Sequence, residues 1–275
     1  MSQTGKSIRL NRIFRAASKR ALIVAYDHAL MLGPIPGTED PAPYLRRFAA
    51  CGVDGVLVSL GTLRNCVDAF LAPQPPAVIA RLDWTNVWHR AGAAQTGDYR
   101  STLVGSVEDA VCDGADAVVT YLFVGSGDAA ADAQEIAKNA EVNRECQRLG
   151  VVHIMESMAR GKDVADCADP AWIRFHTRVA SELGADLIKT DYPREAAALG
   201  EIVSACPTPI LLAGGPRSGG DDQALAMVRG VVAAGAAGLI FGRNVFQSED
   251  MEAFLGRAKE ILAGGPPSPT RQSAH

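Results

Sequence analysis

The sequence predicts an α/β fold, and within that class a single (β/α)8 TIM barrel. Short apolar runs typical of buried parallel strands alternate with amphipathic helical patterns along the 275 residues, and eight such runs can be counted. Alternation of strands and helices requires a parallel sheet, and eight units of about 30 residues close most naturally into a barrel. An open, doubly wound sheet is the alternative, but no Gly-x-Gly-x-x-Gly motif follows the first strand.

A recurring four-residue motif marks the connections from helices to strands. It reads Gly52-Val53-Asp54-Gly55, Gly114-Ala115-Asp116-Ala117, Gly184-Ala185-Asp186-Leu187 and Gly235-Ala236-Ala237-Gly238. In each copy a glycine suited to the left-handed position ends an amphipathic stretch, and a strand-like run follows. The expected strands are 21–26, 55–59, 77–81, 117–122, 151–155, 186–190, 209–213 and 238–241. The expected helices include 43–50, 129–149, 170–183, 194–205, 222–234 and 250–262.

The third unit is irregular between its strand and the next one. Residues 82–102 carry Trp84, Trp88 and His89 together with Gly92 and Gly97, which is too polar for core. We expect either a surface excursion beside the barrel mouth or an irregular connection that packs its tryptophans.

Composition excludes several classes of function. With 48% hydrophobic and 21% charged residues the chain can bury a large core, and a net charge of −4 without a long basic cluster argues against nucleic acid as a partner. No apolar stretch reaches about 18 residues, so no membrane span is expected. The six cysteines form no C-x-x-C pair, so neither metal nor disulfides are expected. We expect a cytoplasmic protein without a cofactor, with the barrel in 1–262 and a disordered tail in 263–275.

The segment 184–193 stands out because a lysine lies in its apolar run. An ammonium inside a barrel is costly unless it is paired or loses its proton. Two interpretations stay open. Lys189 either pairs with a carboxylate such as Asp191, or burial lowers its pKa from roughly 10.4 so that a neutral amine attacks a ketone. Lys162, in a loop after the fifth strand, is the other lysine that could form such an adduct.

Other polar residues end the expected strands, where the active sites of barrels lie. Asp27 ends the first strand and Glu156 ends the fifth. Asp27 could orient the lysine or accept a proton, or it could cap the following turn. The neighbouring His28, and also His153 and His176, are interpreted as packing residues.

The loops after the last two strands suggest a phosphate site. Gly214 and Gly215 follow the seventh strand, and Gly242 and Arg243 follow the eighth. Glycines let backbone N–H groups approach a phosphate, and an arginine adds a bidentate contact. The alternative is two tight turns with solvated arginines.

Five blocks of residues resemble the archaeal-type class I fructose-bisphosphate aldolase family. They are 8–14, 26–37 with its Tyr26-Asp27-His28, 187–190, 213–216 and 242–247. That family also contains aminodideoxyheptulosonate synthases and a thiolase acting on a phosphorylated autoinducer. The resemblance, which spans about residues 8 to 262, implies a Schiff base on Lys189, proton transfer assisted by Asp27, and phosphate held by the glycine loops. It also implies a homo-oligomer, a pentamer or a decamer.

The sequence departs from the family near the fifth strand. Met158 stands where the family has an acid/base tyrosine, and a thioether cannot donate a proton. Either Glu156 takes over proton transfer or the reaction differs, and the plainer alternative is that Glu156 only pairs with Arg160. Tyr121 and Ser126 are weaker candidates for a polar contact to substrate.

The function predicted from these residues is a class I aldolase. It would act on a phosphorylated keto sugar or related keto compound, with Lys189, Asp27 and Glu156 as catalytic residues. Two alternatives remain: an acyl-transferring or condensing relative, and a barrel that binds sugar phosphate without turnover.

Overall fold

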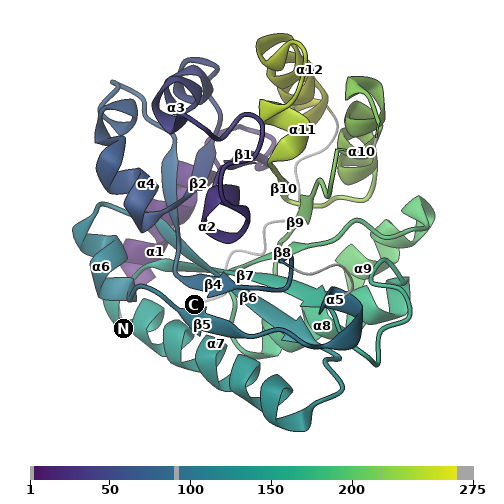
Figure 1. Ribbon diagram of the computed structural model, residues 1–275. Coiled ribbons are helices and arrows are strands. Elements are labelled where there is room, and N and C mark those ends of the chain that lie inside the picture. Colours follow the sequence, from purple (N-terminus) through teal and green to yellow (C-terminus); the bar gives the residue numbers. More distant parts are fainter. Residues whose placement is uncertain (1–2, 90–92, 218, 265–275) are drawn as a thin grey trace.

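Eight parallel strands close into a barrel in the computed structural model, which describes residues 3–89, 93–217 and 219–264 (Figure 1). Their order around the barrel is β1-β10-β9-β8-β7-β6-β3-β2. The strands are β1 (Ala21–Ala25), β2 (Gly55–Ser59), β3 (Ala77–Arg81), β6 (Ala117–Val124), β7 (Val152–Ala159), β8 (Leu187–Thr190), β9 (Ile210–Ala213) and β10 (Gly238–Phe241). The predicted single (β/α)8 barrel is confirmed.

Helices surround the barrel (Figure 1). They are α1 (Gln3–Ile13), α2 (His28–Leu32), α3 (Pro41–Ala50), α4 (Leu60–Asn65), α5 (Ala93–Thr96), α6 (Val107–Cys112), α7 (Ala129–Leu149), α8 (Pro170–Glu182), α9 (Leu199–Ala205), α10 (Asp221–Ala233), α11 (Arg243–Phe246) and α12 (Met251–Ala263). Asp128, Asp169 and Asp250 precede helices and accept hydrogen bonds from first-turn N–H groups, and Gly150 ends α7 in the left-handed conformation. No helix among the described residues is long and apolar enough to span a membrane.

Several expected boundaries differ from the structure, and those of β6 and β7 bear on the site. The strands β6 and β7 extend beyond the expected ends at 122 and 155, because they pair in register from Ala117↔Val152 through Val124↔Ala159. The expected helix 194–205 begins later, as a short 3-10 turn, Ala196–Ala198, followed by α9. Of the expected tail, 265–275 lies outside the described residues.

The aspartates of the repeated Gly-x-Asp motif bind neighbouring strand segments. The carboxylates of Asp54, Asp116 and Asp186 each accept a hydrogen bond from the backbone N–H of a neighbouring strand segment, at 2.8, 3.1 and 2.8 Å. Helix α1 adds cations to two of them, with Lys6 2.6 Å from Asp186 and Arg12 2.7 Å from Asp116. These contacts hold the amino ends of the strands together.

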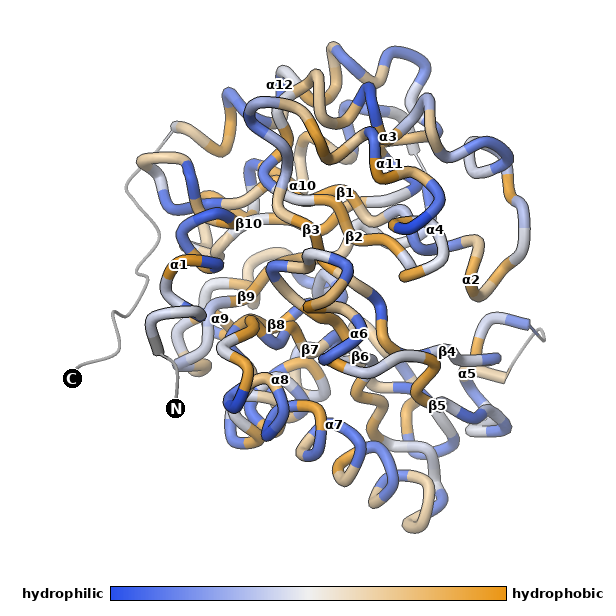
Figure 2. The backbone as a smooth tube through the Cα atoms, turned by 90° about the vertical axis from the view of Figure 1, so that its left-hand side faces the viewer, coloured by the Kyte–Doolittle hydropathy of each residue, from blue (hydrophilic) through white to orange (hydrophobic). Residues whose placement is uncertain are grey.

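Apolar side chains fill the lower barrel. Ile23, Ile79 and Ile154 point inward and pack in one cluster with Ile13 of α1 and Phe14, which follows it, so that this end is closed. A second cluster lies between the strands and the outer helices. Figure 2 shows hydrophobic residues along β1, β2 and β3, whereas the outer helix α7 alternates hydrophilic and hydrophobic residues. Because the lower interior is filled, the site is restricted to the carboxyl ends of the strands.

The irregular third unit forms an excursion over the barrel mouth. Strands β4 (Asp83–Thr85) and β5 (Ser101–Leu103) pair antiparallel, with α5 between them. Val87 and Tyr99 are buried against Phe123 and Met158, so the interpretation of this segment as too polar for core was wrong at these positions. Trp84 also packs on this cluster, whereas Gly92 lies outside the described residues.

Candidate active site

A cavity of about 740 Å³ opens at the carboxyl ends of the barrel strands. Its wall includes six of the predicted site residues: Asp27, Glu156, Lys189, Gly214, Gly215 and Arg243. Gly242 lies behind the wall, where a Cβ atom would meet the His28 ring at 2.2 Å, so this position accommodates the ring only as glycine. Segments far apart in the sequence therefore meet in one site, as the barrel topology predicts.

Lys189 projects from β8 into the cavity and is 6% exposed. Its Nζ lies 2.6 Å from Glu156 Oε1. The expected alternative partner was wrong, because Asp191 instead binds Arg160 at 2.8 Å. A buried amine thus has a proton acceptor in direct contact.

Glu156 lies within β7, directly opposite Lys189 in the pairing of β7 with β8. The extra length of β7 places it inside the strand rather than at its end. The plainer interpretation, that Glu156 pairs with Arg160 at the rim, was wrong. Its second oxygen, Oε2, instead accepts a hydrogen bond from Arg81.

Arg81 connects the carboxylates of the site and was missed in the sequence. This fully buried side chain at the end of β3 donates from Nε to Asp27 Oδ2 at 2.8 Å and from Nη1 to Asp83 Oδ1 at 3.3 Å. Its guanidinium lies 4.0 Å from the ring centre of Tyr121. A charged residue at the end of an apolar strand is the signal that singled out Lys189, and it applies equally to Arg81.

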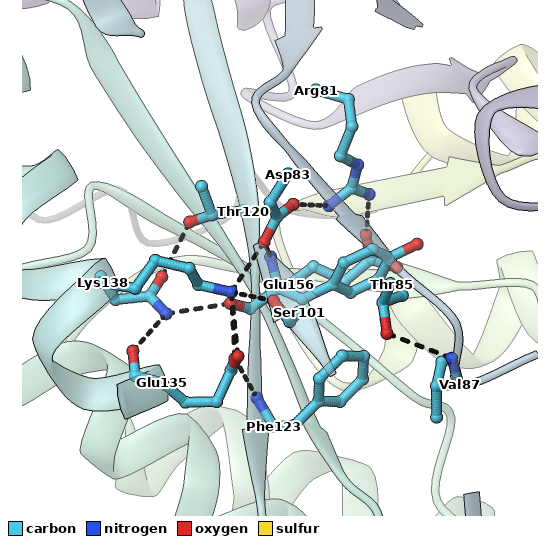
Figure 3. A network of polar contacts seen from close by, with 12 residues as sticks. Arg81, Asp83, Thr85, Val87, Ser101, Thr120, Phe123, Glu135, Lys138 and Glu156 are labelled. Atoms are coloured by element: carbon cyan, nitrogen blue, oxygen red, sulfur yellow. Dashed lines mark hydrogen bonds and ion pairs between the residues drawn. The ribbon is translucent and has the colours of Figure 1, made fainter. Parts of the chain in front are cut away.

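The network continues outward to α7. Figure 3 shows Lys138 between Glu135 and Asp83, with Arg81 beyond Asp83. Lys138 Nζ lies 2.8 Å from Asp83 Oδ2, and Tyr121 N–H donates to the same oxygen at 2.8 Å. Asp83 is therefore held from both sides, which fixes the position of the Arg81 guanidinium.

The charges of this network oppose the effect of burial on the pKa values of the carboxyl groups. Burial alone would raise the pKa of Asp27, but the cations of Arg81 and Lys189 hold it below its usual range. Burial would likewise raise the pKa of Glu156, and Lys189 and Arg81 lower it. Both carboxylates are therefore ionised at neutral pH. His28, by contrast, has its pKa lowered to about 4 by burial and is neutral.

The far side of the cavity carries the two glycine-containing loops. Arg243 is half-buried, its Nε makes no hydrogen bond within the described residues, and burial lowers its pKa. At Gly215, φ is +64° and open space lies where a Cβ atom would be. Arg217, in the loop after β9, is not free, because it pairs with Asp221 at 3.0 Å.

The remaining candidate residues differ in whether they line the cavity. Tyr121 and Met158 line the cavity, whereas Ser126 does not and bonds to Asp128. His28 also lines it, packed edge-on against Phe246, so its interpretation as a packing residue holds only in part. Two further histidines, His153 and His176, are fully buried and are not part of the wall.

A buried lysine paired with a carboxylate at the carboxyl end of a (β/α)8 barrel fits a carbon–carbon lyase of the Schiff-base-forming type. Comparison with known families agrees, because residues 21–248 match the family model "DeoC/LacD family aldolase". The chain belongs to this aldolase family, and it is a class I aldolase, as the resemblance in its sequence predicted.

Relatives in several organisms cover nearly the whole chain. An uncharacterized aldolase of Saccharolobus solfataricus is 33% identical, with 94% of each chain covered. The 2-amino-3,7-dideoxy-D-threo-hept-6-ulosonate synthase of Halobacterium salinarum is 37% identical over 90% of this chain and 87% of its own. The class 1 fructose-bisphosphate aldolase of Thermoproteus tenax is 31% identical, over 92% of this chain and 93% of its own.

The solved structures lead to the same family. An archaeal fructose 1,6-bisphosphate aldolase superposes with a TM-score of 0.80 at 28% identity, covering 94% of this chain and 99% of its own. A further archaeal structure with the same TM-score of 0.80, the same identity and the same coverage has its catalytic lysine covalently bound to the carbinolamine intermediate of the substrate.

Proposed function

We propose that Lys189 forms the Schiff base of this aldolase and that the substrate is a phosphorylated keto compound. The observation that carries the proposal is the 2.6 Å contact between Lys189 Nζ and Glu156 Oε1 inside the cavity. It gives a buried amine an immediate proton acceptor, which nucleophilic attack on a ketone requires. The catalytic barrel would be 1–262, in the cytoplasm.

In the first step Glu156 takes a proton from the Lys189 ammonium. The free amine attacks the ketone carbon, the carbonyl π electrons move to oxygen, and proton exchange gives a carbinolamine. Glu156 then returns its proton to the hydroxyl, which leaves as water while the nitrogen lone pair forms the iminium. Ketone and ammonium have become iminium and water, and Glu156 is again a carboxylate.

In the second step a carboxylate removes the proton of the hydroxyl group next to the scissile bond. Asp27 is suited to this, because the hydrogen bond from Arg81 keeps it ionised and oriented. The carbon–carbon bond breaks, its electrons move to the iminium nitrogen, and an aldehyde leaves. The resulting enamine takes the proton back at carbon, and water hydrolyses the iminium.

The phosphate group would bind at the loops after β9 and β10. Arg243 supplies a cation that pairs with no carboxylate within the described residues. The backbone of Gly214 and Gly215 borders the same part of the cavity, where no side chain blocks an approach to Gly215. Together they supply a charge-assisted contact and backbone donors.

A condensing reaction is the second candidate. The named synthase of Halobacterium salinarum, at 37% identity, favours it, as does the absence of a tyrosine at Met158. The two directions share the Schiff base and differ in whether the physiological product is the released aldehyde or the joined carbon chain.

Borohydride trapping tests the proposal. Dihydroxyacetone phosphate and borohydride should leave a reduced adduct on Lys189, and Lys189→Met should abolish it. The matched control is Lys162→Met, because Lys162 is exposed and lies outside the cavity wall. An adduct lost in the control variant and kept in Lys189→Met would refute the assignment. Release of aldehyde from the natural substrate would separate cleavage from condensation.

A further inference from the structure

We infer that the half of the substrate released as aldehyde is uncharged and apolar, so that the substrate carries a single phosphate. This rests on the proposed function, because it assumes that the keto half is attached to Lys189. It specifies the other end of the same cavity, where the side chains differ in kind from those of the phosphate loops.

The cations of the cavity wall differ in whether a carboxylate pairs with them. Among the described residues of the cavity wall, the side chains with a positive charge are Lys189, Arg243 and Arg160. Lys189 pairs with Glu156 at 2.6 Å, and Arg160 pairs with Asp191 at 2.8 Å. Arg243 alone of these three has no carboxylate partner, so the described part of the wall offers one unpaired cation and matches one phosphate.

Arg160 is held too firmly to serve a second phosphate. Besides its pair with Asp191, its Nη1 donates to Ala159 O at 2.7 Å, and its guanidinium lies 5.4 Å from the ring centre of Trp88. Binding a phosphate there would displace Asp191 and leave a half-buried carboxylate unpaired. Asp166 adds a further negative charge to the same rim, although it pairs with Arg194 at 2.6 Å.

The apolar part of the wall and the phosphate loops lie on different sides of Lys189. The phosphate loops follow β9 and β10 on one side of Lys189, and β7 and β6 lie on its other side. A substrate attached at Lys189 with its phosphate at Arg243 therefore extends toward β7 and β6. Met158, Val87 and Met31 line that part and belong to one apolar cluster with buried Tyr99 and Phe123.

Binding to a wall of this kind is unfavourable for a charged group and favourable for an apolar group. Transfer of one methylene group from water into such a wall improves binding roughly fourfold. A phosphorylated aldehyde would have to lose its hydration there without gaining an unpaired cation from the described residues of the wall. The cavity therefore selects an aliphatic or aromatic aldehyde.

The test is the condensation reaction of the wild-type enzyme with dihydroxyacetone phosphate. The second substrates are propanal, butanal, pentanal, benzaldehyde and glyceraldehyde 3-phosphate, and kcat/KM is measured for each. We expect kcat/KM to rise severalfold per methylene along the aliphatic series. For the apolar aldehydes it should be at least tenfold higher than for glyceraldehyde 3-phosphate. A preference for the phosphorylated aldehyde, or no turnover with any aldehyde of the apolar series, would overturn the inference.

One variant and one matched control complete the test. Val87→Thr keeps the shape of a buried wall residue but adds a hydroxyl, and it should reduce the apolar preference severalfold. Val104→Thr, at an exposed position of the same excursion, should not change it. Equal preference in both variants would contradict the role of the wall. Borohydride labelling by dihydroxyacetone phosphate alone separates the two failures: absent labelling overturns the proposed function and this inference with it, whereas labelling combined with preference for the phosphorylated aldehyde overturns only the inference.

Discussion

Replacement of Arg81 by methionine tests the charge balance of the site. The guanidinium is fully buried and contacts Asp27, Asp83 and Glu156. Removing one partner of a buried ion pair costs about 3 to 5 kcal/mol, because the remaining charge stays desolvated. The carboxylates can relieve this only by binding protons, and one pKa unit corresponds to roughly 1.4 kcal/mol. We therefore expect the pKa of Asp27 or Glu156 to rise by about 2 units in Arg81→Met.

The sign of the effect on stability follows from these shifts. In the wild type both carboxylates have lowered pKa values, so their stabilisation is present above the ordinary values of 3.8 and 4.5 and is lost as the pH falls through the lower folded-state values. In Arg81→Met at least one folded-state pKa lies above its wild-type value, so part of that stabilisation is lost at every pH above the wild-type value. The deficit in free energy of unfolding should therefore grow as the pH rises from the wild-type folded-state pKa to the raised pKa of the variant, and it should stay constant above that.

Two measurements check this prediction. Urea unfolding at a series of pH values gives the deficit, and the rate of borohydride labelling against pH gives the acid limb of adduct formation. Arg81→Lys is the matched variant, because it keeps the charge without the planar fork, and it should recover part of both quantities. A deficit independent of pH, together with an unshifted acid limb, would show that Arg81 acts only through packing.

Four further predictions concern separate parts of the molecule. Glu156→Gln should slow turnover by roughly 10²-fold or more, because general acid/base catalysis supplies about that factor, and a wild-type kcat would remove it from the mechanism. Arg243→Ala should weaken substrate binding by about 1.5 to 3 kcal/mol and abolish competition by inorganic phosphate, and unchanged KM and inhibition constants would place its role elsewhere. His176 has two buried nitrogens without hydrogen bonds in the described structure, and burial lowers its pKa to about 3, so the folded state binds no proton between pH 6.5 and 3 while the unfolded state does. His176→Leu should therefore reduce the loss of stability in acid by roughly 1 kcal/mol per pH unit, whereas an unchanged slope in urea unfolding would contradict this. The resemblance implies a pentamer or decamer, and the 54% exposed Phe175 on α8 offers apolar surface for it, so a monomeric mass in light scattering would refute assembly.

The strands were predictable because a barrel buries them on both faces. That burial makes each run almost wholly apolar, as in β2 and β3, whose bounds match the expected ones. The same rule made Lys189 conspicuous. Predicting the strand ends gave Asp27 and Glu156 as neighbours of the site, since all strands of a parallel barrel end at one mouth.

The residues that contact these side chains could not be predicted from the sequence. Glu156 meets Lys189 because β7 and β8 pair with these residues opposite each other, and register depends on the assembled barrel rather than on either strand. Arg81 joins Asp27 from a strand two places away in the barrel, across β2. Its isolation in an apolar run could have been noticed, but the choice among the three carboxylates it binds is set by the closed structure.

The burial of Val87 and Tyr99 was hidden by their neighbours. The excursion between β3 and β6 is rich in polar residues and glycine, and its few apolar side chains have no helical or strand periodicity. They pack because the segment folds back over the mouth onto Phe123, a contact that no local pattern encodes.

The central claim is that Lys189 carries the covalent step, and mass spectrometry of the borohydride-reduced protein tests it most directly. After incubation with dihydroxyacetone phosphate, the peptide containing Lys189 should carry the mass of the reduced ketone adduct, and Lys189→Met should carry none. An adduct on another lysine, or undiminished turnover in Lys189→Met, would contradict the account.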